Sequence, residues 1–231
     1  MTTLTPTKAT GAIAQPAEAL YIDPECQISE NAVAHTIDLP GVNGAFVADV
    51  ISAMLAHERC GAHLYRSVAS RTNNPMLERR YKELGEETEH HVEVLEQLVT
   101  SAGGNPNYVS AMARLVEGTD SKLLESTFML NGAADIMTEE LGMLDAVFLA
   151  ESMDHANWHT FAALVDSLPD GEIKNACAAA VADVEDQEDE HLDWARSTKR
   201  RLVELQATSA IAAKAEMKAE EMLAAVRNWL S

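Results

Sequence analysis

Apolar residues recur at three- and four-residue steps along most of the chain, which is the spacing of one face of an α-helix. The pattern forms four long segments, at about 43–72, 75–102, 138–168 and 171–206. Turn-forming residues separate them: Thr72-Asn73-Asn74-Pro75, Gly103-Gly104 and Pro169-Asp170-Gly171. The sequence therefore predicts four long amphipathic helices.

The links between these segments differ in length. Tight turns join the first segment to the second and the third to the fourth, so each pair is expected to form an antiparallel hairpin. The link between the hairpins, residues 104–137, contains helical fragments at 108–117 and 122–130, interrupted by Gly118 and Gly132. A link of this length can return the chain along the bundle, and one long crossover between two hairpins is the ferritin-like arrangement. We therefore predict an all-α, ferritin-like four-helix bundle over residues 42–206.

The two ends of the chain differ from the bundle. Residues 1–41 contain Thr, Pro and Gly without helical periodicity, which predicts an irregular N-terminal extension. Residues 207–231 predict an extra C-terminal amphipathic helix, with an apolar stripe made of Ile211, Met222, Val226 and Trp229. Such a stripe suits packing on the bundle or on a second subunit, so we expect a homodimer.

Charge and cysteine content narrow the functional classes. The formal net charge is −20, which repels nucleic-acid phosphates and attracts cations. No apolar run is long enough for a membrane span, and residues 1–20 do not resemble a signal peptide. The three cysteines form no Cys-x-x-Cys motif, which argues against a disulfide scaffold and favours a reducing, cytoplasmic location.

Acidic residues interrupt each apolar stripe near its middle, at Glu58, Glu87, Glu151 and Glu188. Burying four carboxylates without compensation would be prohibitive, and few basic residues lie on these faces. Two divalent cations would supply the missing positive charge. A cation site inside the bundle is therefore expected.

Two of these glutamates begin a Glu-x-x-His motif, which ends at His90 and at His191. Residues three apart lie on the same face of a helix, so one helix can offer a carboxylate and an imidazole together. Glu58 and Glu87 lie at equal distances from the first turn, and the glutamates of the second hairpin are placed equally about theirs. Each motif is therefore expected to face a lone glutamate at its own height.

This set resembles the ligands of the ferritin-like di-iron and di-manganese carboxylate proteins, over about residues 43–206, and looks closest to the rubrerythrin-like branch. The resemblance implies two iron ions, with manganese as the alternative. It implies that Glu58 and Glu151 are terminal ligands, that Glu87 and Glu188 bridge, and that each histidine binds one ion. The implied ligands are Glu58, Glu87, His90, Glu151, Glu188 and His191.

Some positions allow more than one role. His91 could replace its neighbour His90. Glu140 lies on the same face as Glu151, although an acidic residue at the start of a helix also has a capping role. His155, one turn after Glu151, could contact a ligand or be a hydrogen-bonded core histidine, and Tyr65 could be redox-active or simply part of the core.

Three functions are compatible with these features. The first is an oxidoreductase that reacts with peroxide or dioxygen, favoured because the extra helices could cover a site and block assembly of a storage cage. The second is a ferroxidase or iron-storage subunit, and the third is a metal-free helical interaction protein. The rubredoxin-like module of rubrerythrins needs four paired cysteines, which this chain lacks. Peroxide reduction would therefore need an external electron donor protein, whereas a manganese catalase-like reaction would not.

Overall fold

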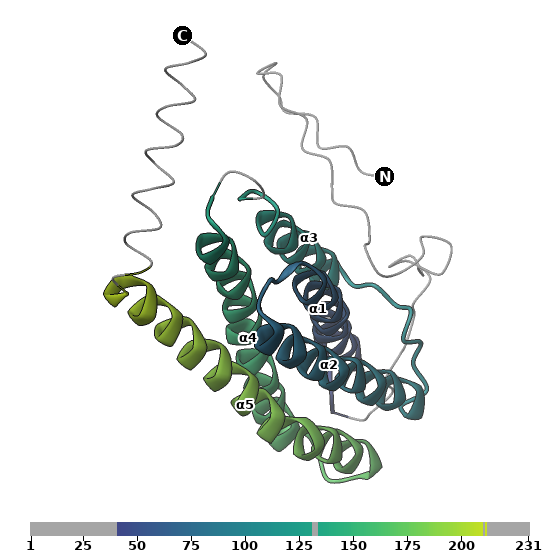
Figure 1. Cartoon of the computed structure of the whole chain (residues 1–231). Helices are drawn as coiled ribbons and strands as arrows, with labels where there is room; N and C mark the ends of the chain where they lie inside the picture. The colour runs from purple at the N-terminus through teal and green to yellow at the C-terminus, as the bar shows by residue number, and fades with distance from the viewer. Residues whose placement is uncertain (1–40, 131–133, 210, 212–231) are drawn as a thin grey trace, which may run out of the picture.

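The computed structural model describes residues 41–130, 134–209 and 211. In this part the helices are α1 (Gly44–Arg71), α2 (Pro75–Ser101), α3 (Ala111–Ser126), α4 (Ile136–Ser167) and α5 (Glu172–Thr208) (Figure 1). The pairs α1–α2 and α4–α5 form two hairpins, and the hairpins meet where α1 contacts α4 and α2 contacts α5. The predicted ferritin-like four-helix bundle is confirmed.

The helix ends follow local chemistry. The side chain of Asn74 accepts a hydrogen bond from the backbone N–H of Met76, and Pro75 opens α2. Gly103 follows α2 with a φ of 79°, a left-handed conformation that glycine adopts without strain. The start of α4 lies earlier than the predicted Thr138, because the carboxylate of Asp135 accepts the backbone N–H of both Met137 and Thr138.

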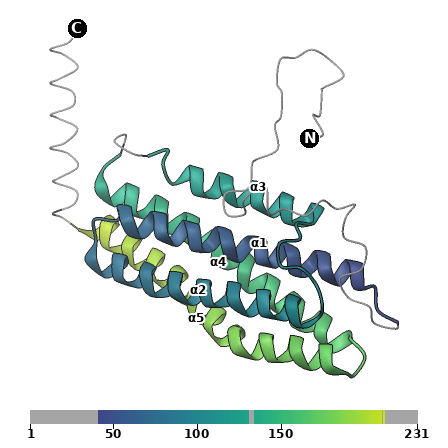
Figure 2. The ribbon, with the colours of Figure 1, turned by 90° about the vertical axis from the view of Figure 1, so that its right-hand side faces the viewer.

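The crossover contains one continuous helix where two fragments were predicted. Figure 2 shows α3 lying along α1, and Gly118 sits inside α3 without breaking it. A glycine in a helix interior costs about 1 kcal/mol. Tertiary contacts outweigh this cost: Nδ1 of His57 on α1 lies 2.7 Å from Oδ2 of Asp120 on α3, and both side chains are buried. Gly132 lies outside the described residues.

Two apolar clusters fill the bundle, one toward each end. The first includes Ile51, Leu95, Phe161 and Val184, and the second includes Leu64, Leu84, Val147 and Ala195. On every one of the four bundle helices, a stretch between the two clusters carries buried polar residues. The fold therefore holds a polar layer between two apolar layers.

The predicted terminal segments lie largely outside the described residues. Nothing in the structure bears on the extension over 1–40, and of the predicted C-terminal stripe only Ile211 is described, 82% exposed. The last described helix, α5, continues past the predicted end at residue 206 to Thr208. None of the helices in the described ranges combines the length and the apolar character that crossing a membrane requires.

Candidate metal centre

Five of the buried residues in the polar layer carry possible metal ligands that lie close together, and they come from all four bundle helices. Their exposed fractions are at most 4%, and they are Glu58 on α1, His91 on α2, Glu151 on α4, and Glu188 and His191 on α5. They form two overlapping groups of three, and within each group one oxygen or nitrogen from every residue lies within 4.8 Å of the others. Glu188 belongs to both groups. These groups could hold metal ions.

The two groups meet at the carboxylate of Glu188. Its Oε1 lies 2.9 Å from Nδ1 of His91 and 3.8 Å from Nδ1 of His191. Nδ1 of His91 is also 3.5 Å from Oε2 of Glu58, and Nδ1 of His191 is 3.3 Å from Oε2 of Glu151. The two imidazole rings are stacked, with centroids 5.6 Å apart. Glu188 is thus placed to be shared by two cations.

The outer nitrogen of each histidine faces an acceptor. Nε2 of His191 lies 2.7 Å from Oε2 of Glu87, and Nε2 of His91 lies 3.1 Å from Oε1 of Gln187. An N–H at Nε2 satisfies these acceptors, so Nδ1, which faces the carboxylates of the layer, is the nitrogen that a cation would bind. Without a cation, burial lowers the pKa of His91, but the hydrogen bonds and charges of Glu188 and Glu58 outweigh burial and raise this pKa to about 11. A hydrogen bond on the outer nitrogen is the usual way in which a protein orients a metal-binding imidazole.

Glu58 and Glu151 are each held by a hydrogen bond from an aromatic side chain of the other hairpin. The indole Nε1 of Trp158 on α4 donates to Oε1 of Glu58 on α1, at 2.8 Å. The hydroxyl of Tyr65 on α1 donates to Oε1 of Glu151 on α4, at 2.7 Å. Each contact fixes one carboxylate oxygen and leaves Oε2 facing the histidine of its group.

The inward-facing atoms contact one another as ion pairs and make no further hydrogen bonds, although buried polar atoms normally do. They are Oε2 of Glu58, Nδ1 of His91, Oε2 of Glu151, both oxygens of Glu188 and Nδ1 of His191. Burial raises the pKa of Glu188 to about 7, against the opposing effect of His91. Carboxylate oxygens and imidazole nitrogens that converge in a buried layer fit the ligand set of an iron or manganese site.

Asp154 adds a further acid that was not predicted from the sequence. It lies one turn after Glu151 on α4, is 5% exposed, and its Oδ1 has no hydrogen-bond partner. Burial, followed by the negative charges of Glu188, Glu58 and Glu151, raises the pKa of its carboxyl well above the usual value. Its position three residues after Glu151 on the same face was the signal that could have identified it.

The predicted register of α2 needs a correction of one residue. The structure does not bring His90 into the layer: its side chain is 45% exposed and its Nε2 lies 3.1 Å from Oδ2 of Asp183. Its neighbour His91 takes the inward position, which was the second possibility for this helix. Glu87 is 39% exposed and contacts the outer nitrogen of His191, so Thr88 occupies the buried position three residues before His91.

Glu140, His155 and Tyr65 differ in how they relate to the layer. Glu140 lies away from it and accepts hydrogen bonds from the hydroxyl of Thr72 and the backbone N–H of Asn73, both at 2.6 Å, so it caps the turn of the other hairpin. His155 does not reach the polar layer and contacts Asp189 on the outer side of α5. Tyr65 is buried and contacts Glu151 directly.

Comparisons with known proteins add the family. No curated protein matches the chain, and no solved structure matches it. A family model described as "Domain of unknown function (DUF892)", a family of ferritin-like fold, matches residues 46–208, which include most of α1 and all of α2, α3, α4 and α5. The chain therefore belongs to the DUF892 family.

Proposed function

We propose that this protein is a di-metal carboxylate protein that binds two iron ions, or two manganese ions, in the polar layer and reacts with peroxide or dioxygen as an oxidoreductase. The observation that supports it is the convergence of six buried ligand atoms from five residues on all four helices. Three carboxylates face only two imidazoles there, so the residues cannot neutralise one another, and divalent cations would supply the missing positive charge.

The ligand assignment follows from the two groups. Glu58 and His91 would hold one ion, Glu151 and His191 the other, and Glu188 would be shared. Asp154 would supply a further negative charge beside the shared carboxylate once cations offset the effects that raise its pKa. Three glutamates and an aspartate against two neutral imidazoles match the charge of two divalent cations.

The chemistry of the pair depends on the metal, since bound iron or manganese supplies the electrons or the electron-accepting capacity for a reaction with peroxide or dioxygen. The protein's own residues have separate tasks. The two apolar clusters keep bulk water from both ends of the layer. Glu87 bridges the layer and solvent: its carboxylate bonds to Nε2 of His191 and is partly exposed, so it can pass a proton between that nitrogen and water.

The partners belong to the same proposal. The chain has three cysteines and none of the paired motifs that hold a rubredoxin-type iron, so reduction of peroxide would draw electrons from an external donor protein. The proposed assembly is a homodimer, built on the apolar C-terminal stripe. Light scattering at micromolar protein concentration tests it, and a multi-subunit cage would instead favour the storage function.

Metal content is the first test. The protein, loaded with Fe²⁺ or Mn²⁺ and then desalted, should retain about two ions per chain by elemental analysis. The adjacent histidines of α2 form a matched pair of variants. His91→Ala should lose at least one ion because it removes an inward donor, whereas His90→Ala should keep both because its side chain faces solvent.

Turnover is the second test. Peroxide consumption by the loaded protein should fall in His91→Ala and stay unchanged in His90→Ala, while circular dichroism shows that both variants are folded. A wild-type content near zero would refute the metal centre. Two ions with no turnover, and further iron accumulating on exposure to air, would move the function to ferroxidase or storage.

A further inference from the structure

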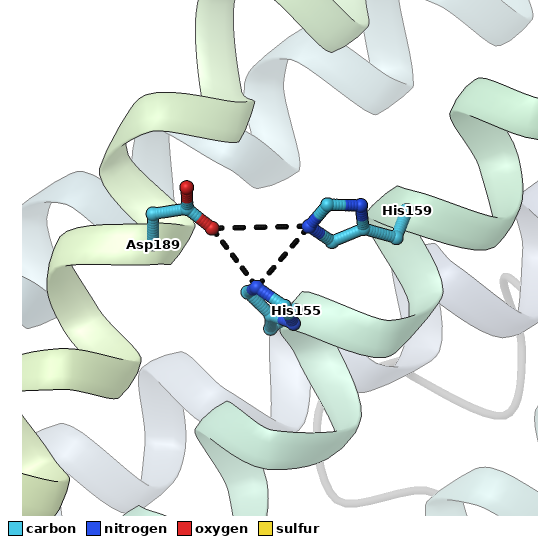
Figure 3. Close-up of side chains that lie close together, drawn as sticks. All are labelled: His155, His159 and Asp189. Carbon is cyan, nitrogen blue, oxygen red and sulfur yellow. Dashed lines mark hydrogen bonds and ion pairs between the residues drawn. The ribbon is translucent and has the colours of Figure 1, made fainter.

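A second group of metal-binding side chains lies on the outer face of the α4–α5 hairpin. His155 and His159 stand one turn apart on α4, and Asp189 reaches toward them from α5 (Figure 3). Their side chains are 30%, 52% and 58% exposed, in that order. None of the three contributes to the buried layer, although Asp189 directly follows Glu188 in the sequence.

Three ligand atoms converge on one point. Nε2 of His155 lies 2.9 Å from Oδ1 of Asp189 and 3.1 Å from Nε2 of His159, and this second nitrogen lies 3.8 Å from the same oxygen. Ligands bound at about 2.0–2.1 Å around a tetrahedral ion are about 3.3 Å apart. The observed separations lie on both sides of that value, so one ion could contact all three atoms after small side-chain movements.

Hydrogen bonds alone explain the contacts among these three side chains less completely than a bound cation does. Nε2 of His155 faces two acceptors, the carboxylate of Asp189 and the ring nitrogen of His159, and it carries at most one proton. One of the two short contacts is therefore left without a donor. A proton on Nε2 of His159 does not change this, because Nε2 of His155 could accept it only when unprotonated, and its contact with Asp189 would then lack a donor. A cation satisfies all three atoms at once.

The surrounding charge also favours a cation. Oε1 of Glu185 on α5 lies 3.8 Å from Nδ1 of His159, on the other side of that ring. The ion pairs that Asp189 makes among the described residues are with the two histidines. Two imidazole nitrogens and one carboxylate suit zinc, cobalt, nickel, copper or ferrous iron, and are poor ligands for magnesium or calcium.

We propose that His155, His159 and Asp189 form a solvent-accessible site for one divalent transition-metal ion, separate from the buried centre. Three protein ligands leave at least one position open to water or to a small ligand. The ion would also link α4 to α5 on the outside of the hairpin whose inner face contributes Glu151, Glu188 and His191. The site requires no movement of the backbone, because the ligand atoms already converge.

A chelating resin charged with Zn²⁺ tests the accessible site selectively, because an ion fixed to a resin cannot enter the buried layer. The full untagged chain should be retained, and the double variant His155→Ala/His159→Ala should pass through. His63→Ala and His91→Ala should be retained like the wild type. Since His91 belongs to the proposed buried centre and not to this site, its result separates the failure of one proposal from the failure of the other.

Zinc content gives the second measurement. After dialysis against micromolar Zn²⁺, Asp189→Asn should hold one zinc ion fewer per chain than the wild type, and its affinity for that ion should be at least about tenfold weaker. Asp186→Asn is the matched control, because Asp186 is an exposed aspartate on the same helix. Equal zinc content in the two variants, or retention of the double variant on the resin, would overturn the site.

Discussion

The two hairpins place equivalent residues at equivalent positions of the polar layer, but they differ in the number of buried carboxylates that they contribute. Residues of α2 correspond to residues of α5 one hundred positions later, so His91 corresponds to His191 and Thr88 to Glu188. Residues of α1 correspond to residues of α4 ninety-three positions later, so Glu58 corresponds to Glu151. Both hairpins therefore contribute a glutamate and a histidine, but only α5 contributes the carboxylate three residues before its histidine.

The correspondence between α1 and α4 also shows why Asp154 has no acidic counterpart in the first hairpin. Gly61 on α1 corresponds to Asp154 on α4, and a Cβ at Gly61 would lie 3.3 Å from the methyl group of Thr88. In the first hairpin these two positions hold a small residue and a hydroxyl, packed closely together. In the second hairpin they hold two carboxylates. The negative charge of the layer is thus concentrated on the α4–α5 side, and metal binding should depend unequally on the two hairpins.

Removing the shared carboxylate of Glu188 should have the largest effect and tests whether metal binding depends unequally on the two hairpins. Glu188→Gln keeps the shape of the side chain and removes a charge that both groups of ligands use, so the metal content after loading should fall from about two ions per chain to less than one. Thr88→Val, at the corresponding position of α2, should retain both ions because the hydroxyl bonds to the backbone oxygen of Leu84. Elemental analysis of both variants decides, and equal losses would mean that the hairpins contribute equally.

The architecture was predictable from the sequence because it depends on long-range periodicity. Alternating apolar steps, turn residues and one long link define four helices in two hairpins, and the structure has the same order. On α5, both residues of the Glu188-x-x-His191 motif lie on the buried face of the helix, as predicted.

On α2 the motif misled the prediction. The buried positions Leu77, Tyr81, Leu84, Thr88, His91, Leu95 and Leu98 alternate in steps of four and three without interruption. That stripe was present in the sequence and passes through Thr88 and His91, but Glu87 and His90 beside it matched a familiar pattern. A helix shows its buried face over many turns, and two residues of suggestive chemistry do not override that face.

The side-chain contacts of the layer were less accessible to prediction. Register places residues at the same height, yet it does not say that Trp158 bonds to Glu58 or that Glu140 caps the opposite turn. Those contacts depend on how the two hairpins dock. Docking is a tertiary property that a periodic pattern on single helices does not define.

The hairpins also differ on their outer faces, since α3 covers α1 and clamps it through a buried ion pair. His57 lies 2.7 Å from Asp120 and 3.1 Å from the backbone oxygen of Ala150, its own counterpart on α4. Asp120→Ala should destabilise the protein by about 3–5 kcal/mol, because it leaves a buried imidazolium without its partner. Asp145→Ala, which breaks the more exposed pair with Lys199, should cost about 0–1 kcal/mol. Urea unfolding of both variants measures the difference.

The clamp also predicts the sign of a pH effect. Burial lowers the pKa of His57, but the hydrogen bond and the charge of Asp120 outweigh it and raise the pKa from 6.5 to about 9. Because the pKa of His57 is higher in the folded than in the unfolded protein, its protonated form stabilises the fold. This contribution is complete below about pH 6.5, the pKa of histidine in the unfolded chain, and is lost as the pH rises through about 9. The free energy of unfolding should therefore fall between pH 7 and 10 in the wild type. That fall should shrink in Asp120→Ala, and an unchanged slope would contradict the ion pair.

A smaller effect is expected from replacing Asp154, which should raise the stability of the metal-free protein but lower its affinity for metal. Asp154→Asn removes a buried carboxyl that faces three glutamates, so the metal-free protein should become more stable. The same change removes negative charge from the layer, so affinity for the second ion should weaken by about tenfold or more. Thermal unfolding with and without metal measures both. A variant that loses stability in the metal-free state would show that Asp154 is held by a contact rather than crowded by charge.

The smallest expected effect tests the reciprocal contacts that join the hairpins. Tyr65→Phe removes only the hydroxyl that donates to Glu151, and we expect the ion held by Glu151 and His191 to bind about tenfold less tightly. The ion held by Glu58 and His91 should be unaffected, because its carboxylate is fixed by Trp158 instead. Trp158→Phe should reverse the pattern, with an additional loss of stability from the space that the indole leaves. A metal titration that resolves two binding steps distinguishes them, since each variant should weaken one step only. If both variants weakened the same step, the two ions would not be assigned to separate groups, and Glu188 would be the centre of a single site.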